Sequence, residues 1–262
     1  MPQKLYQIDA FANEVFSGNP AAVCPLEQWL SDGLLQKIAM ENNLAETAFY
    51  VKHGDEYQLR WFTPTVEVDL CGHATLAAAF VLFNHESHLG NTIHFHSPRS
   101  GILTVTKEDE LLTLNFPTDQ LDQISLTDEL ISGFNIRPQL AFKGKTDYML
   151  VFDSEEEIKK VIPSFEVISK LKARGIITTA KGDKVDFVSR FFAPAAGVNE
   201  DPVTGSAHTT LIPYWSKRLG KTDLTAMQLS SRRGYLKCKC LNDRVEISGQ
   251  GRLYLIGQIY LV

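Results

Sequence analysis

The densest group of reactive side chains in the sequence lies in residues 199–208, NEDPVTGSAH. Acids, hydroxyls, a glycine and an imidazole follow one another there, and residues 209–215 are mostly apolar. This pattern predicts an acidic turn that runs into a helix, whose first free backbone N–H groups come from around Gly205 and Ser206. Because the first N–H groups of a helix have no partner inside it, such a helix start can bind an anion.

The same plan occurs once earlier in the chain. Residues 60–64, RWFTP, are followed by residues 69–75, DLCGHAT, and then by an apolar run; residues 190–194, RFFAP, precede the stretch at 199–208 in the same way. The chain therefore looks like a duplicated unit. A chain of 262 residues can bury a large core. We expect an N-terminal half, 1–117, and a C-terminal half, 118–262, with the last strand of the chain returning to the first half.

Hydrophobic periodicity predicts mostly strands, with one long apolar helix in each half. In the first half the strands are expected at 5–10, 21–24, 46–51, 57–62, 92–96, 102–107 and 111–116, and the helices at 31–43 and 74–83. In the second half the strands are expected at 140–143, 148–152, 176–180, 185–192, 235–241, 244–247 and 252–262, and the helices at 154–162, 165–172 and after Gly205. Residues 118–127 are polar and are expected to be connective. Pro213 should kink or shorten the last helix, because it removes a backbone hydrogen bond.

Composition and charge exclude several functions. The net charge is −5 and no long cluster of Lys and Arg occurs, which argues against a nucleic-acid partner. The longest apolar stretch, 76–83, is far shorter than the ~20 residues that cross a bilayer, and the N-terminal residues lack the pattern of a signal peptide. Four cysteines in a chain of this length do not make a disulfide framework. We therefore expect a soluble, cytoplasmic protein with reduced thiols and no membrane partner.

Each expected helix start offers polar groups that could bind a ligand. The first offers Cys71, Gly72 and His73, and the second offers Asp201, Thr204, Gly205 and Ser206. If the halves fold alike, a cleft between them would have both helix starts facing it, which suits a small molecule that bears a carboxylate. Small residues at helix starts are also ordinary capping residues, so each loop taken alone leaves both readings open.

Glu46 is the third candidate, in residues 43–49, NLAETAF. Small and apolar side chains bracket this carboxylate at the start of an expected strand. Burial would raise its pKa from ~4.3 toward ~6–7, where a glutamate can both accept and return a proton near neutral pH. A lone glutamate on a strand is more often a solvated edge residue, so the catalytic reading depends on the other two loops.

Other reactive groups give weaker patterns. Ser206 and His208 lie two apart on a helix and point to different faces, and no Gly-x-Ser-x-Gly motif surrounds the serine, so we reject a hydrolase triad. The remaining pairs are too few in ligands for a metal site: His85 with His88, His94 with His96, and Cys238 with Cys240. No phosphate-binding glycine loop occurs at a strand–helix junction. The sequence indicates no metal and no cofactor.

Five ordered motifs resemble those of the PhzF family of phenazine-biosynthesis-like isomerases. They are residues 18–23, GNPAAV; 44–47, LAET; 60–64, RWFTP; 69–75, DLCGHAT; and 200–208, EDPVTGSAH. The resemblance runs through the whole chain. It implies an α+β fold similar to that of diaminopimelate epimerase, with two pseudo-symmetric halves, each a curved, mostly antiparallel, barrel-like sheet around a central helix. This implication agrees with the internal repeat.

The resemblance also implies roles for the candidate residues. Glu46 would be the proton shuttle; His73, Asp201 and Ser206 would hold and polarise the substrate, helped by the amides of Gly72 and Gly205, with Cys71 and Thr204 as possible accessory groups. In the best-studied member type the reaction is a cofactor-independent isomerisation of a dihydro-hydroxyanthranilate, and members are commonly homodimers.

Three hypotheses follow from the sequence. The leading one is a cofactor-independent isomerase that moves a proton between carbons of a small carboxylic acid. The second is a thiol-dependent amino-acid epimerase or racemase that uses Cys71, although the second loop has no matching cysteine. The third is a protein that binds small acids without turnover.

Overall fold

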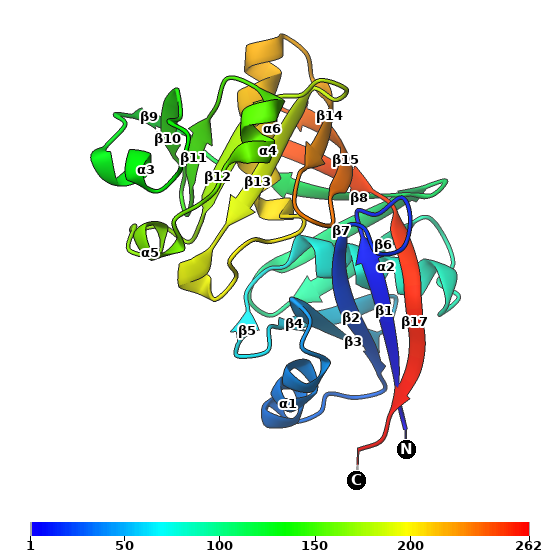
Figure 1. The fold of residues 1–262 in the computed structure, drawn as a ribbon. Helices are drawn as coiled ribbons and strands as arrows, with labels where there is room; N and C mark the ends of the chain where they lie inside the picture. Colours follow the sequence, from blue (N-terminus) through cyan, green and yellow to red (C-terminus); the bar gives the residue numbers. More distant parts are fainter. Residues whose placement is uncertain (1, 262) are drawn as a thin grey trace. The chain divides into compact units, whose positions relative to one another are not determined.

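The computed structural model describes residues 2–261, and the chain divides into two compact units (Figure 1). Unit 1 consists of Met1–Asn115 and Ser248–Val262, and unit 2 consists of Phe116–Ile247. The final strand, β17 (Gly251–Ile259), pairs antiparallel with the first, β1 (Gln3–Ala10), inside unit 1. No helix in residues 2–261 is long and apolar enough to cross a membrane.

Unit 1 is a mixed sheet wrapped around one apolar helix. Besides β1 and β17 it contains β2 (Asn19–Leu26), α1 (Asp32–Asn42), β3 (Glu46–His53), β4 (Glu56–Phe62), β5 (Glu67–Val68), α2 (Gly72–Asn84), β6 (Thr92–Ser97), β7 (Gly101–Glu108) and the start of β8 (Leu111–Pro117). Helix α2 lies against β1, β2 and β3. Residues 73–79 are all buried, which is about two helical turns, so α2 is covered on every side, as its apolar sequence predicts.

Helix α1 covers another part of the same sheet. Its buried residues Leu35, Ile38 and Ala39 follow helical spacing and pack with Phe49 of β3 and Phe62 of β4. The helix ends at its C-cap Asn43, whose φ of 48° lies in the left-handed region. The predicted helix and its stop are therefore confirmed. This turn delivers the chain to the start of β3.

Unit 2 repeats this plan with different side chains. It contains β9 (Asp122–Ile124), α3 (Asp128–Ser132), β10 (Leu140–Lys143), β11 (Tyr148–Val151), α4 (Glu155–Lys160), α5 (Phe165–Ile168), β12 (Ile176–Lys181), β13 (Phe187–Phe192), the 3₁₀ turn η1 (Pro194–Ala196), α6 (Gly205–Leu219), β14 (Asp223–Gln228), β15 (Gly234–Leu241) and most of β16 (Arg244–Gly249). Helix α6 lies against β14 and β15. Its N-terminal end, like that of α2, begins at a glycine.

The strand pairings show the duplication directly. In unit 1, β1–β2 is antiparallel, β2–β3 parallel, β3–β4 antiparallel, β4–β6 parallel and β6–β7 antiparallel. In unit 2 the same five directions recur for β10–β11, β11–β12, β12–β13, β13–β14 and β14–β15. The α+β fold of two pseudo-symmetric halves, each a curved sheet around a helix, is therefore confirmed.

Two local expectations were wrong, and one of the two effects expected of Pro213 does not occur. Residues 118–127 contain the short strand β9, which pairs with β10 and has no apolar alternation that would reveal it. The helix expected at 165–172 ends at Ile168. Pro213 does not shorten α6, which runs for 15 residues. The carbonyl of Thr209, which Pro213 cannot bond, accepts a hydrogen bond from the backbone N–H of Asp119 at 3.2 Å instead, so the lost helical bond is replaced.

Candidate active site

The start of α2 positions two of the candidate residues. Cys71 is the N-cap, with extended backbone angles of φ −142° and ψ 110°, and its side chain makes no capping hydrogen bond. Gly72 and His73 then form the first turn of the helix. The side chain of Cys71 therefore accepts no hydrogen bond from the first-turn N–H groups of α2.

Glu46 reaches the same place from β3. It is the first residue of that strand and pairs with Ala21 of β2, just beyond the left-handed turn at Asn43. Its side chain is 19% exposed. The alternative, a solvated edge residue, does not describe Glu46, since most of its side chain is covered.

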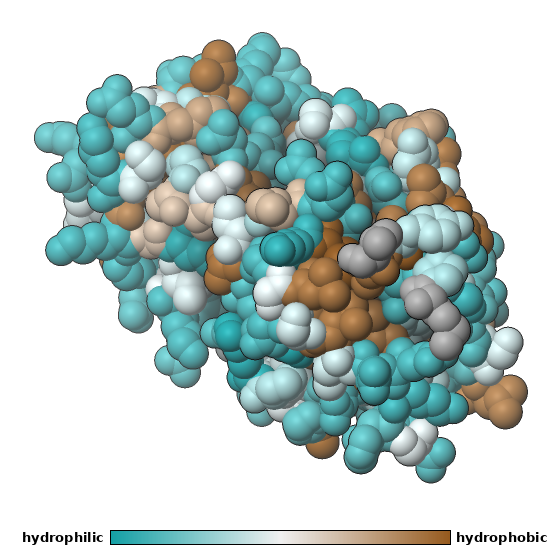
Figure 2. Space-filling view, turned by 90° about the horizontal axis from the view of Figure 1, so that it is seen from below, coloured by the Kyte–Doolittle hydropathy of each residue, from teal (hydrophilic) through white to brown (hydrophobic). Residues whose placement is uncertain are grey.

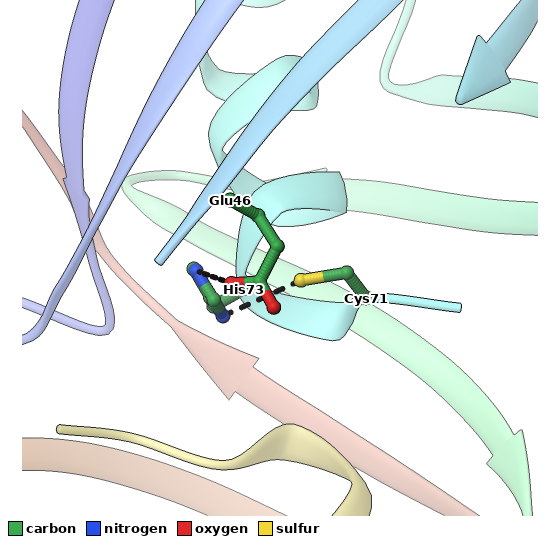
Figure 3. A group of neighbouring side chains, drawn as sticks. All are labelled: Glu46, Cys71 and His73. Atoms are coloured by element: carbon green, nitrogen blue, oxygen red, sulfur yellow. Dashed lines mark hydrogen bonds and ion pairs between the residues drawn. The ribbon is translucent and has the colours of Figure 1, made fainter. Parts of the chain in front are cut away.

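His73 connects these groups, as Figure 3 shows. Its Nε2 lies 3.2 Å from Oε2 of Glu46, and its Nδ1 lies 3.5 Å from Sγ of Cys71. The amide Nδ2 of Asn19 lies 3.2 Å from the same Nδ1. An amide nitrogen only donates, so Nδ1 accepts and the ring proton is on Nε2, the nitrogen nearer to the carboxylate.

Burial decides the charge of this histidine. His73 is 4% exposed, and desolvation lowers its pKa to about 3. At neutral pH the ring is uncharged, and its Nε2 lies 3.2 Å from Oε2 of Glu46. His73 can thus orient a carboxylate or polarise a ligand, but it does not exchange protons with solvent near pH 7.

Glu46, Cys71 and His73 also form a set of possible metal ligands within residues 2–261. One ligand atom from each lies within 4.8 Å of the others. Carboxylate, thiolate and imidazole together suit a borderline metal such as Zn²⁺. Nδ1 of His73 already accepts from Asn19, so Nε2, 3.2 Å from Oε2 of Glu46, is the ring nitrogen that such a site would use.

The start of α6 carries the second group of candidates. Thr204 is the N-cap, and its hydroxyl donates to Oδ2 of Asp201 at 2.5 Å and does not cap the helix. Gly205 and Ser206 form the first turn; Gly205 is buried and Ser206 is partly exposed. The predicted turn and helix start are both confirmed.

His208 belongs to the core of unit 2. It is fully buried, its Nδ1 donates to the carbonyl of Thr204 at 2.9 Å, and its ring packs against Phe187. Desolvation lowers its pKa to about 4, with the Thr204 bond acting in the opposite direction. No contact joins it to Ser206 among the described bonds, in agreement with the rejection of a hydrolase pair.

The structure thus brings Glu46, Cys71, Gly72 and His73 together in unit 1, and Asp201, Thr204, Gly205 and Ser206 together in unit 2. Sequence reasoning gave no role to two buried residues that contact these groups, Asn19 and Gln228. Asn19 could have been found, because a polar residue between a glycine and a proline in an apolar strand has few reasons to be there. Gln228 gives no such signal, since its partners are 24 to 27 positions away.

Comparison with known proteins shows the family. The family model for phenazine biosynthesis-like proteins, PhzC-PhzF, matches residues 8–257. An uncharacterized isomerase of Pseudomonas aeruginosa is 50% identical over 262 residues, with all of both chains covered. The human phenazine biosynthesis-like domain-containing protein is 37% identical, and the match covers 99% of each of the two chains.

Solved structures show the same fold. A PhzF family protein of Enterococcus faecalis has a TM-score of 0.97 at 50% identity, with both chains fully covered. A hydroxyproline epimerase of Agrobacterium vitis has a TM-score of 0.64 at 9% identity, covering 98% of this chain and 91% of its own, which shows a shared fold alone.

Two duplicated sheets, each around a helix with an uncapped polar start, define a protein of the epimerase-like α+β class. Within that class the chain belongs to the phenazine biosynthesis-like PhzC-PhzF family.

Proposed function

We propose that this protein is a cofactor-independent isomerase that moves a proton between carbons of a small carboxylic acid, with Glu46 as the proton carrier. The observation that carries the proposal is the contact between Glu46 and the neutral His73, 3.2 Å apart and mostly shielded from water. The names of relatives, uncharacterized isomerases among them, support the reaction class.

The proposed chemistry needs no change of oxidation state. A C–H bond of the substrate breaks, its proton passes to the carboxylate of Glu46, and the electron pair moves into the adjacent unsaturated system. The protonated Glu46 then delivers the proton to a different carbon of the same molecule. His73 stays neutral beside the carboxylate throughout, because its pKa of about 3 prevents it from taking the proton itself.

The substrate carboxylate is assigned to the helix starts. Neither α2 nor α6 has a side-chain cap at its N-cap residue. Backbone N–H groups and the positive end of the helix dipole both favour an anion there. We propose that Asp201 and Ser206, with the amides of Gly72 and Gly205, hold and polarise the same substrate molecule on which Glu46 acts. The resemblance noted above makes a dihydro-hydroxyanthranilate the first compound to test.

A panel of small acids in D₂O tests the reaction class. Dihydro-hydroxyanthranilate, other cyclic acids and amino acids would each be incubated with the wild-type protein, and carbon-bound deuterium would be followed by NMR. An isomerase places deuterium on a new carbon of an accepted substrate. Binding of acids without deuterium incorporation across the whole panel would instead favour the non-catalytic alternative.

A second function, thiol-dependent epimerisation, is favoured by one observation. Sγ of Cys71 lies 3.5 Å from Nδ1 of His73, so the thiol belongs to the same cluster as Glu46. Residues 199–208 contain no cysteine that could act as a second thiol. Cys71→Ala separates the two mechanisms: the isomerase keeps its turnover, whereas a thiol-dependent epimerase loses it.

We also propose that the protein is a cytoplasmic homodimer that uses the surface of β17. The side chains of Tyr254, Leu255 and Ile256 are 48%, 39% and 57% exposed, so this strand presents apolar groups on both faces. Phe16, 69% exposed, contacts Tyr254 edge to face. Figure 2 shows that one view of the surface is mostly hydrophilic, with apolar residues gathered in a patch. Exposed apolar groups concentrated on one strand favour association.

All four cysteines are free, as expected for a reducing compartment.

A further inference from the structure

A buried glutamine forms hydrogen bonds with the backbone of the turn that carries Asp201. Gln228, the last residue of β14, is 0% exposed. Its Oε1 accepts a hydrogen bond from the backbone N–H of Thr204 at 2.9 Å, and its Nε2 donates to the backbone carbonyl of Asp201 at 2.7 Å. One amide group therefore binds both ends of the turn, with its donor and its acceptor each used in a fixed direction.

The same amide orients the Thr204 hydroxyl. Nε2 of Gln228 lies 3.2 Å from Oγ1 of Thr204, and the single hydroxyl proton of Thr204 goes to Oδ2 of Asp201. Threonine at an N-cap ordinarily turns its oxygen toward the first-turn N–H groups of the helix. Here the hydroxyl is held away from them, so the start of α6 has no cap from Thr204.

We propose that Gln228 is a positioning residue for the substrate carboxylate. It acts through the turn in two ways, by fixing the Asp201 side chain through Thr204 and by keeping the first-turn N–H groups of α6 open to an anionic ligand. This inference rests on the proposed function, because it assigns the α6 start to the carboxylate of the substrate.

The surrounding strands show that the turn is fixed from this side. Oγ of Ser230 donates to the carbonyl of Pro202 at 2.9 Å. A Cβ on Gly234 would lie 2.1 Å from a methyl carbon of the fully buried Val203, so β15 approaches the turn as closely as a glycine allows. Gln228 thus lies in a tightly packed region and supplies the hydrogen bonds to the turn backbone that apolar packing cannot give.

Two variants separate positioning from bulk stability. Gln228→Met keeps the volume but removes both polar functions, while Gln228→Glu keeps the acceptor and replaces the donor. A protonated glutamate can donate to the Asp201 carbonyl as the amide does, so lowering the pH should restore the contact in this variant alone. Thr210→Val is the matched control. Thr210 is a buried residue of α6, and the substitution removes its hydrogen bond to Asp119 without touching the turn.

Few other groups near Gln228 complicate the pH dependence. Its cross-strand neighbours, Ser189 and Gly234, do not titrate in the range used. The titratable groups connected to it are Asp201, through the turn, and His208, through the Thr204 carbonyl. Since the pKa of His208 is about 4, that ring stays neutral between pH 5 and 8.

The closing experiment measures ligand binding and amide exchange on the intact protein. Acetate, benzoate and anthranilate would be titrated while the backbone amide signals of Gly205 and Ser206 are followed by NMR, and hydrogen exchange of the Thr204 amide would be measured alongside. We expect Gln228→Met to weaken carboxylate binding roughly tenfold or more and to speed Thr204 exchange by a similar factor, as loss of a buried hydrogen bond predicts. On an accepted substrate, KM should rise more than kcat falls.

The outcomes distinguish this inference from the proposed function. If the acids shift Gly205 and Ser206 in the wild type but no acid is turned over, the isomerase proposal fails and the role of Gln228 is still tested by binding. Equal binding in wild type and Gln228→Met would overturn the inference. So would an equal loss in Thr210→Val, or a Gln228→Glu variant whose binding relative to wild type does not improve between pH 8 and pH 5.

Discussion

At the scale of single residues, the site depends on a few close backbone approaches. Gly18 precedes Asn19, whose amide orients His73. The φ of Gly18 is +66°, and a Cβ on Gly18 would lie 2.2 Å from the carbonyl oxygen of Ala10. Only glycine fits this position without moving the backbone. The motif at residues 18–20 is therefore explained by geometry at its first position and by hydrogen bonding at its second.

Gly18→Ala should destabilise the protein by roughly 1–3 kcal/mol, since both the left-handed φ and the contact with Ala10 are unfavourable for a side chain. Gly33→Ala is the matched control, because Gly33 lies in the first turn of α1 and a Cβ there meets nothing within 4 Å. The control should change stability by less than about 1 kcal/mol. Urea denaturation measures both; equal losses would mean that the close approach at Gly18 is unimportant.

The buried histidines predict how stability changes with pH. The pKa of His208 falls from 6.5 to about 4 on folding, so the unfolded chain binds its proton more readily. The stability associated with the neutral ring is present above pH 6.5 and is lost as the pH falls toward 4, by about 1.4 kcal/mol for each unit. His73, with a pKa of about 3, adds a loss in the same direction.

His208→Gln should therefore lower stability at pH 7 but flatten the pH dependence. The free energy of unfolding, measured by urea denaturation between pH 7 and pH 5, should fall less steeply in the variant because one titrating group is gone. Thr210→Val, which removes no titrating group, should keep the wild-type slope. A His208→Gln slope as steep as that of wild type would show that His208 does not carry the effect.

At the scale of elements, the arginine of each Arg-x-Phe-x-Pro motif forms a two-pronged ion pair with a glutamate, which we call the brace of that loop. The guanidinium of Arg60 makes two bonds to Glu67, at 2.7 and 2.8 Å, and lies over the ring of Phe62. Arg190 makes the same two bonds to Glu200, at 2.7 and 3.0 Å, and lies over Phe192. Each glutamate precedes the first helical glycine by five positions. The braces therefore fix the two loops that lead into α2 and α6.

Arg190→Lys should loosen the loop before α6 although it keeps the charge. Lysine cannot reproduce the two-pronged contact with Glu200 or the bonds that Arg190 donates to the carbonyls of Ile158 and Val161. We expect a loss of roughly 1–3 kcal/mol in stability and faster hydrogen exchange in residues 199–204. Lys170→Arg, in an exposed ion pair with Glu166 of α5, should leave both unchanged. Unaltered exchange at 199–204 in Arg190→Lys would show that the brace does not hold the loop.

Sequence patterns predicted these elements well where the pattern is local. The apolar run of α2, the alternation of β4 and the glycine starts of both helices follow from spacing alone. The polar strand β9 could not be predicted, because its only signal is the partner β10. The expected shortening of α6 at Pro213 does not occur for a similar reason: the bond from Asp119 to Thr209 joins segments 90 positions apart, so no local pattern shows it.

The candidate site was predicted residue by residue, but its hydrogen bonds were not. Glu46 and His73 could be chosen from their motifs, and the structure adds their contact and the tautomer that Asn19 sets. Gln228 was missed because no strand was expected at 223–228, where β14 lies, and because an isolated glutamine gives no signal of its own. The shared action of Glu46, His73 and Asp201 on one substrate stays a prediction.

At the scale of the whole molecule, duplication explains why the polar residues lie at two helix starts. Each sheet buries an apolar helix and leaves the polar N-terminal loop of that helix as the place where chemistry can be added. The two copies have then diverged, with Glu46, Cys71 and His73 in one and Asp201, Thr204 and Ser206 in the other. The two halves of this chain thus share one fold but carry different side chains at their helix starts.

The proposed homodimer predicts a change of mass from one substitution. Ile256→Glu places a charge in the exposed apolar strand β17 and should convert a dimer into a monomer, because a buried unpaired charge is costly. Ile102→Glu, on another exposed apolar side chain of unit 1, should stay dimeric. Light scattering after size-exclusion chromatography gives the mass. A wild-type monomer, or a dimeric Ile256→Glu variant, would contradict the use of β17.

The account as a whole depends on Glu46 as the group that carries the proton. The most direct measurement is the rate at which deuterium from D₂O enters a carbon of an accepted substrate, compared between wild type, Glu46→Gln and the exposed control Glu41→Gln. The amide of Glu46→Gln can still contact His73 but cannot accept a proton, so we predict a loss of about 10²-fold or more in that variant and none in the control. Equal deuterium incorporation in wild type and Glu46→Gln would contradict the account.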